Sequence, residues 1–214
     1  MSRQYTLKKR AEQVAETRRR IVEAAVDLHG TVGPAATTLS MIAERAGVQR
    51  HTLYAHFPEE RSLYLACSGL ALERDPLPQA ESWADIENVR ERLRQGLSAV
   101  YGWYARNDEL AACVLRDAEH HALTREIAEL RFGQPFADYR QVLGAGLTPP
   151  QQALVAVALN FHAWRTLAHE TPLSPTAAAE LFADAIAAMS SSDSAPNVVD
   201  ASRRRDGRRR NAVS

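Results

Sequence analysis

Residues 47–57, GVQRHTLYAHF, concentrate side chains that form hydrogen bonds. The eight residues from Gln49 to His56 include a Gln, an Arg, two His, a Thr and a Tyr. Arg pairs with guanine and Gln with adenine through two hydrogen bonds each, while Thr, Tyr and His suit phosphates and thymine methyl groups. Residue types in this order favour recognition of a nucleic-acid groove.

The residues around this segment predict a helix-turn-helix. Thr38 suits the N-cap of a helix over 39–46, because its hydroxyl can accept a backbone N–H. Gly47 can adopt the left-handed conformation that a tight turn needs, and a second helix should cover 49–55. The apolar residues of both helices should point inward: Leu39, Ile42, Val48 and Leu53.

The pattern TLSMIAERAGV at 38–48, followed by TLYAHFP at 52–58, resembles the signature of the TetR family of bacterial transcriptional regulators. The resemblance covers about residues 15–65, and the rest of the chain agrees only in being helical and of suitable length. Members of that family are dimeric repressors whose C-terminal domain binds a small effector. The resemblance implies an all-α protein with an N-terminal three-helix DNA-binding domain and a C-terminal helical ligand-binding and dimerisation domain.

The resemblance also implies residue roles toward a palindromic operator in double-stranded DNA. One residue would contact a phosphate from a helix N-terminus, three would face the major groove, and two would hold the DNA backbone. In that order they are Thr38; Gln49, Arg50 and Thr52; Tyr54 and His56. His51 is a seventh candidate DNA contact, although it departs from the family pattern. Phe57 would pack the second helix onto the first helix of the domain.

Two positions depart from the family pattern. His51 stands where many relatives have a small residue, often Gly. Glu60 stands where relatives commonly place a Lys that meets a phosphate, and Arg61 points about 100° away from it on a helix. We expect modest operator affinity, unless the basic arm at 3–20 compensates; the alternative for that arm is a solvated helix start.

Helical spacing of apolar residues, with caps and breakers, predicts about nine helices. Besides the two above, they cover 11–31, 58–72, 82–106, 108–120, 122–143, 148–169 and 174–189, with a linker at 74–79. Ser82 and Asp85 have the spacing of a capping box, and the helix at 122–143 should be interrupted near Gly133 and Pro135.

Charge divides the chain into three parts that match the predicted domains. Residues 1–65 carry a net charge of +3, residues 66–190 of −6 and residues 191–214 of +3. A basic head on an acidic body suggests that only the head meets a polyanion, although differences this small also arise by chance. The last part should be a disordered tail whose Arg runs either touch phosphate or are simply solvated.

Two predicted helices, 148–169 and 174–189, are candidates for a homodimer interface. The second has an apolar stripe of Leu181, Phe182, Ala185, Ile186 and Met189. A two-fold four-helix interface would fit this pattern, and the alternative is that the stripe packs on its own subunit.

An effector pocket is expected among the helices from 85 to 170. Aromatic walls with few polar anchors suit an apolar or aromatic molecule, although core packing explains the same residues. The candidates are Tyr101, Tyr104, Arg116, His120, Phe136, Phe161, His162 and Arg165.

Other functional classes lack their residue patterns. The two Cys are far apart, no His, Cys or carboxylate cluster has metal-ligand spacing, and no cofactor loop or catalytic set of residues can be assembled. The stretch 141–164 lacks charge, but its apolar centre is too short for a membrane span. We expect a cytoplasmic protein that is not an enzyme and has no cofactor or metal.

The sequence therefore favours a transcriptional repressor that an effector releases from DNA, with movement passing through the helix at 58–72. A transcriptional activator and an effector-independent regulator remain alternatives. A third alternative is a helical ligand-binding or enzymatic domain without DNA function.

Overall fold

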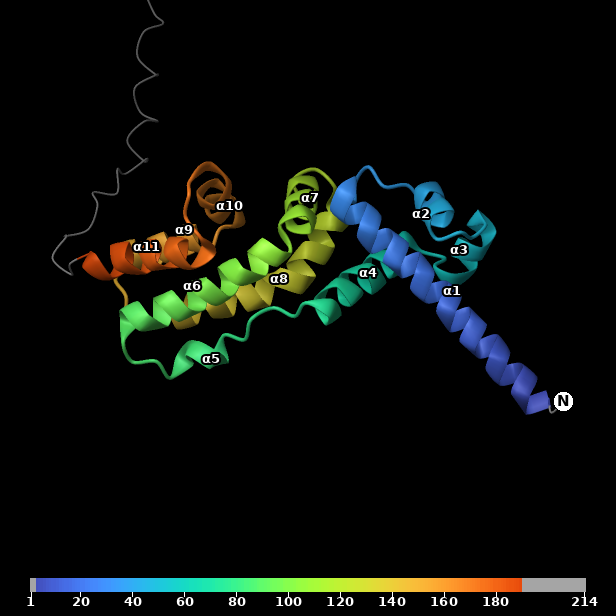
Figure 1. The fold of residues 1–214 in the computed structure, drawn as a ribbon, viewed down its shortest axis with the longest axis horizontal. Coiled ribbons are helices and arrows are strands. Elements are labelled where there is room, and N and C mark those ends of the chain that lie inside the picture. The colour runs from blue at the N-terminus through green and yellow to red at the C-terminus, as the bar shows by residue number, and fades with distance from the viewer. Residues whose placement is uncertain (1–2, 190–214) are drawn as a thin grey trace, which may run out of the picture.

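The computed structural model describes residues 3–189, and this part of the chain is entirely helical, as predicted (Figure 1). It contains eleven helices rather than about nine. They are α1 (Arg3–Thr31), α2 (Leu39–Arg45), α3 (Arg50–His56), α4 (Glu60–Arg74), α5 (Glu81–Ala84), α6 (Val89–Arg106), α7 (Asp108–Ala118), α8 (Ala122–Leu143), α9 (Pro149–Ala158), α10 (Phe161–Glu170) and α11 (Pro175–Ala188). The predicted tail at 191–214 lies outside the described residues.

The predicted helix over 82–106 is wrong, because it is divided into α5 and α6. Helix α5 is a single turn that buries Trp83 in the core. Asn88 then caps α6, and its side chain accepts the N–H of Glu91 at 2.9 Å. The buried Arg92 donates to the carbonyl of Ile86 at 2.8 Å, which holds the intervening loop against α6. The capping-box spacing of the sequence therefore marked the wrong start.

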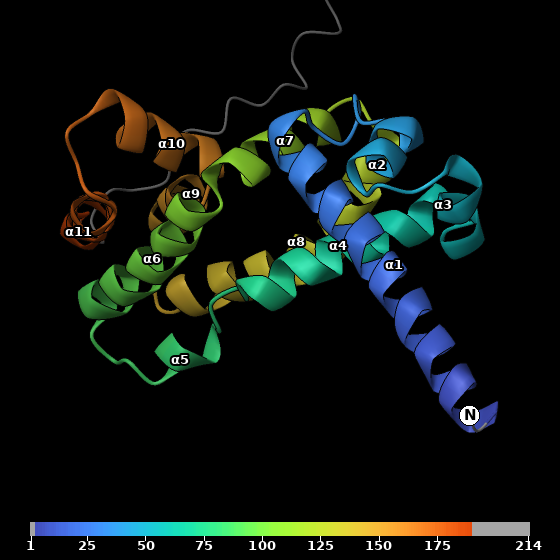
Figure 2. The ribbon, with the colours of Figure 1, turned by 45° about the vertical axis from the view of Figure 1, so that its right-hand side comes forward.

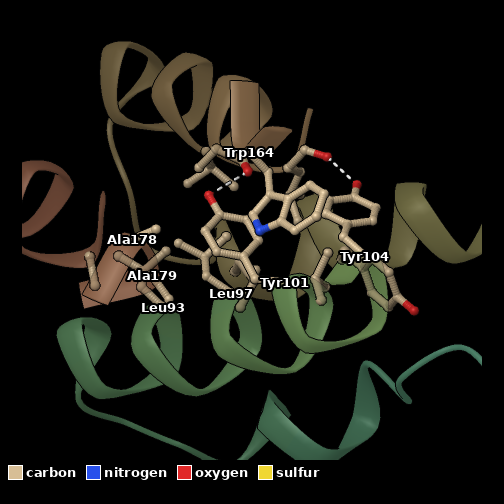
Figure 3. Close-up of a cluster of buried hydrophobic side chains, with 14 of the residues drawn as sticks. Leu93, Leu97, Tyr101, Tyr104, Trp164, Ala178 and Ala179 are labelled. Carbon is tan, nitrogen blue, oxygen red and sulfur yellow. Dashed lines mark hydrogen bonds between the residues drawn. The ribbon is translucent and has the colours of Figure 1, made fainter. Parts of the chain in front are cut away.

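The predicted helix over 148–169 is also wrong, because it breaks between α9 and α10. Asn160 starts α10 by accepting the N–H groups of His162 and Ala163. Carbonyls at the end of a helix need outside donors. The hydroxyls of two α6 residues supply them: Tyr101 donates to Ala158 O at 2.8 Å, and Tyr104 donates to Leu159 O at 2.6 Å (Figure 3).

Two other helix starts and one expected interruption differ from the prediction. Helix α1 begins at Arg3 instead of 11, because residues 3–10 contain no helix breaker. Pro58 lies in the turn before α4, whose N-cap is Glu59. Helix α8 continues through Pro135, although proline removes one backbone hydrogen bond, since Tyr139 and Leu143 beyond it are buried in the core.

The buried apolar side chains form two cores. The first gathers residues from α1, α2, α3 and α4, which lie together at one end of the molecule (Figures 1 and 2). The second gathers residues from α5 to α11. Helices α1 and α4 touch both regions, since α1 packs on α7 and α4 packs on α8.

The predicted dimer stripe on α11 is divided between the core and the surface. Ala178, Ala179 and Ala183 let α11 lie close against Leu93 and Leu97 of α6 (Figure 3). Three stripe residues remain exposed and two pack inside their own subunit. The exposed ones are Leu181, Ala185 and Met189, and the internal ones are Phe182 and Ile186.

None of the helices between residues 3 and 189 is both long enough and apolar enough to cross a bilayer.

Gly47 tests the turn that connects α2 to α3. Its φ is 64°, a left-handed value that disfavours a side chain. We expect Gly47→Ala to lower the free energy of unfolding by about 1 kcal/mol, measured by urea denaturation. Gly102→Ala in the middle of α6 is the matched control and should raise it by about 0.5 kcal/mol. Equal effects of the two changes would contradict the role assigned to the turn.

Candidate nucleic-acid interface and adjoining cavity

The turn between α2 and α3 is built as its sequence predicted. The Thr38 hydroxyl accepts the N–H of Met41 at 3.2 Å and caps α2, and a hydroxyl that accepts a bond can still donate one. Gly47 closes the helix, and the N–H of Val48 donates to Ala43 O at 2.9 Å. Ala43 is buried, so α3 crosses close to α2.

Helix α3 presents its polar side chains outward. Its apolar anchors, Leu53 and Phe57, are each 1% exposed. Arg50 donates to the Tyr54 hydroxyl at 3.4 Å and lies over its ring, so these two form one outward pair. The seven predicted DNA-binding residues have the following positions: Thr38, Gln49, Arg50, His51 and Tyr54 are exposed, whereas Thr52 and His56 are half-buried.

Arginines of α1 hold the two short helices in place. Arg18 donates to His56 O at 2.9 Å, and its guanidinium lies 4.1 Å from the centre of the Phe57 ring. Arg20 donates to Ala46 O at 3.2 Å. Each cation therefore meets the carbonyl end of a helix, where the helix dipole favours positive charge. Arg19 forms ion pairs with Glu16 at 2.7 Å and Glu23 at 2.8 Å, both in its own helix.

The start of α4 presents negative charge on its surface. Glu60 is the first residue of α4 and is exposed. Arg61 pairs with Glu126 of α8 at 2.7 Å and so ties α4 to the body. Its guanidinium is engaged away from the position where the family pattern places a cation.

The loop between α1 and α2 is joined to the C-terminal end of α7. The buried Asp117 carboxylate accepts the N–H of Ala35 and the Nε–H of Arg116, both at 2.8 Å. Arg116 also donates to Val32 O at 3.2 Å. Burial alone would raise the pKa of Asp117, but these hydrogen bonds outweigh it and hold the pKa below its usual range. Gly33 has a φ of 100°, and any side chain there would collide with both α7 residues.

A cavity of about 550 Å³ lies next to this joint. Residues of α1, α4, α6, α7 and α8 line it, together with the segment where α9 ends and α10 begins. The volume is in the range typical of small-molecule sites. Most of the wall is apolar or aromatic, with Trp103 and Phe132 among its rings.

The predicted effector residues separate into two groups. Tyr104, Phe136, Phe161 and His162 line the cavity. The other four lie elsewhere: Tyr101 is in the core, Arg116 is in the joint, Arg165 pairs with Asp108, and His120 is on the surface. Within the described part of the chain, no three His, Cys, Asp or Glu side chains gather as a metal site would require.

A buried polar group at the cavity wall, His29, was not predicted from the sequence. His29 of α1 lies 4.9 Å from the Tyr64 ring, and its Nδ1 is 3.5 Å from Cys67 Sγ. Its Nε2 has no partner among the described residues. Tyr64 also donates to Pro34 O at 2.9 Å, so it links the cavity to the α1–α2 loop. Nothing in the spacing of residues 29 and 64 signals this meeting of α1 with α4.

Comparison with known families places the N-terminal domain. Residues 21–67 match the family described as bacterial regulatory proteins, tetR family. This range contains α2, α3 and most of α1's buried face. A comparison with curated proteins finds no match.

Several solved structures share the fold of the chain. A TetR-like transcriptional regulator from Rhodococcus sp. RHA1 is 21% identical, with a TM-score of 0.56 over 79% of this chain and 93% of that one. A second transcriptional regulator from the same source is 15% identical, with a TM-score of 0.56 over 79% and 95%. The multidrug binding protein EbrR, solved with imidazole, is 22% identical, with a TM-score of 0.52 over 86% and 98%. At these identities the likeness shows a shared fold.

The buried His29 predicts a pH dependence of stability. Burial lowers the pKa of His29 to about 4, against about 6.5 in an unfolded chain. Between these values the unfolded state takes up a proton that the folded state does not, so stability falls as the pH falls from 6.5 to 4. Between pH 7.5 and pH 5, wild type should lose on the order of 2 kcal/mol more than His29→Gln in urea denaturation. His120→Gln, at an exposed histidine, should follow wild type; equal losses in all three proteins would refute the prediction.

Proposed function

We propose that this chain, whose residues 21–67 match the family described as bacterial regulatory proteins, tetR family, is a repressor that a small-molecule effector releases from operator DNA. One observation carries this proposal. A short helix, α3, is fastened by the buried Leu53 and Phe57 and presents Gln49, Arg50 and Tyr54 to solvent. A helix held this way can enter a major groove.

Six of the seven candidate DNA contacts keep the roles that the family pattern implies, and His51, which departs from that pattern, is placed beside them. Gln49, Arg50 and His51 face the bases together with Thr52, and the phosphates meet the remaining three, which are Thr38, Tyr54 and His56. One seven-residue helix reads few base pairs, so two copies on a palindromic operator are needed. The homodimer forms through the segments 148–169 and 174–189, where Val157 and Leu181 are exposed.

The cavity is the proposed effector site. It is lined in part by α1 and α4, the helices that pack with α2 and α3 in the N-terminal core. Its aromatic rings suit an apolar or aromatic molecule. The structural relative EbrR is described as a multidrug binding protein, which supports a small-molecule site in this fold. An effector that binds better to the conformation with displaced α3 helices shifts the population away from DNA.

The remaining expectations follow from this function. The domains divide at about residue 65, with residues 66–190 as the effector and dimer domain. The function includes no catalytic step, in keeping with the non-enzymatic regulators of the family. A regulator of this kind works in the cytoplasm, where it reaches the chromosome.

A mobility-shift assay with DNA from upstream of the protein's own gene tests the proposal. Wild type should bind a palindromic segment, and affinity should fall steeply with salt because phosphate contacts release counterions. Tyr54→Ala should weaken binding about 10-fold without changing the dimer, since a lost phosphate contact and a loosened Arg50 each cost affinity. Arg90→Ala, which removes a cation in α6, should bind like wild type. Binding that ignored sequence, or an unchanged Tyr54→Ala, would contradict the assignment.

Glu60 gives a second test of how the domain meets DNA. Its carboxylate is exposed at the first position of α4 and would repel a nearby phosphate. Glu60→Lys should tighten operator binding about 10-fold and steepen its salt dependence. Glu87→Lys, an exposed change of the same charge before α6, is the control. Weaker binding by Glu60→Lys would show that Glu60 has a positive role in recognition.

A further inference from the structure

The charged residues on the cavity wall are mostly basic. Three arginines, Arg125, Arg131 and Arg140, line the cavity with a single carboxylate, Glu129. The surrounding body is acidic overall, so this local excess of positive charge runs against the charge of its domain. A wall of this kind favours an anionic ligand.

Arg131 differs from the other two arginines because it is partly buried. Its Nε donates to Ser68 Oγ at 3.1 Å, and its Nη2 donates to Leu65 O at 2.9 Å. Both acceptors are neutral groups of α4, and no carboxylate of the described residues pairs with this guanidinium. A partly desolvated cation gains most from an anionic partner.

The other two arginines are compensated in other ways. Arg125 is exposed and donates to Ala118 O at 2.9 Å and to Glu119 O at 2.6 Å. Arg140 is exposed, so water screens its charge. Of the three arginines, Arg131 therefore gains the most electrostatic stabilisation from a bound anion.

The wall beside Arg131 is aromatic. Phe132 follows it in α8, with its ring 5.9 Å from that of Trp103 and 6.4 Å from that of Phe136. A ligand reaching Arg131 therefore lies with its body against these rings. One anchoring cation at an apolar wall fits one negative charge on an apolar body, and the planar guanidinium fork matches a carboxylate.

We propose that the cavity binds a monocarboxylate with an apolar body and that Arg131 holds the carboxylate. This inference rests on the proposed function, because it takes the cavity as the effector site. Since Arg131 also holds Leu65 and Ser68, the carboxylate sits against α4, the helix that follows the helix-turn-helix.

Three probes of equal chain length test the head group: decanoate, decan-1-ol and decyltrimethylammonium. Binding is followed without DNA by the change in tryptophan fluorescence, because one of the three tryptophans, Trp103, lies in the cavity wall; the probes stay below micelle-forming concentrations. Wild type should bind decanoate at least about 10-fold more tightly than decan-1-ol, and the cation most weakly. Arg131→Gln should bind decanoate and decan-1-ol alike, while Arg131→Lys should keep part of the preference.

The control is Arg94→Gln, a change of the same charge on α6 outside the cavity wall, which should keep the full preference for decanoate. Arg125→Gln and Arg140→Gln, on the wall, should each lose less of that preference than Arg131→Gln. Equal binding of decanoate and decan-1-ol by wild type, no binding of any probe, or a preference that survives in Arg131→Gln would overturn the proposal. If Arg131→Gln binds decan-1-ol as tightly as wild type, the variant is folded. If Arg131→Gln does not fold, the test rests on the head-group preferences of Arg131→Lys and of wild type. A protein that prefers decanoate but binds no operator would refute the proposed function and leave this inference standing.

Discussion

The buried carboxylate of Asp117 is the fixed point between the two parts of the molecule. It accepts a backbone N–H from the α1–α2 loop, and its ionised state is held by Arg116 beside it. Gly33 brings the loop so close to α7 that no side chain fits between them. Moving the α1–α2 loop away from α7 would break the charge-assisted hydrogen bond to the buried Asp117, and such a loss costs more than an exposed one.

This constraint gives the cavity two routes to the DNA-binding surface. The sequence predicted one of them, through the helix that became α4. The structure adds the other, because Tyr64 in the cavity wall bonds to Pro34 in the same loop that Asp117 holds. Under the proposed function, a bound molecule that shifts α7 or α4 would act on that loop through Asp117 or through Tyr64. Packed joints of this kind switch between discrete arrangements rather than deforming gradually.

The sequence predicted the helix-turn-helix well because its signals are local. The cap at Thr38, the turn at Gly47 and the spacing of Leu53 and Phe57 all act within one or two helical turns. The break between α9 and α10 has a distant cause, since the hydroxyls of Tyr101 and Tyr104 satisfy carbonyls 57 and 55 residues away. Local capping rules contain no such partner, so the longer helix was the natural prediction.

The same distinction explains the residues of the cavity. Four of the eight predicted effector residues line it, because aromatic residues on amphipathic helices often face a shared interior. His29 and Arg131 could not be predicted, since one lies on α1 and the other faces α4 from α8. Their roles depend on how α1, α4 and α8 meet, and that meeting is set by the packing of the whole chain.

Four arginines of the N-terminal domain are engaged within the fold. Arg18 and Arg20 meet the carbonyl ends of α3 and α2, Arg19 pairs within α1, and Arg61 pairs with α8. Counting charges along the sequence therefore overstates what the domain offers to a polyanion. The basic side chains beyond the packed part of α1, at Lys8, Lys9 and Arg10, are exposed on a helix that projects from the domain (Figure 1). Because Glu60 occupies the place of a cation in the family pattern, the proposed operator binding would depend for its electrostatic attraction on this projecting segment and on Arg50.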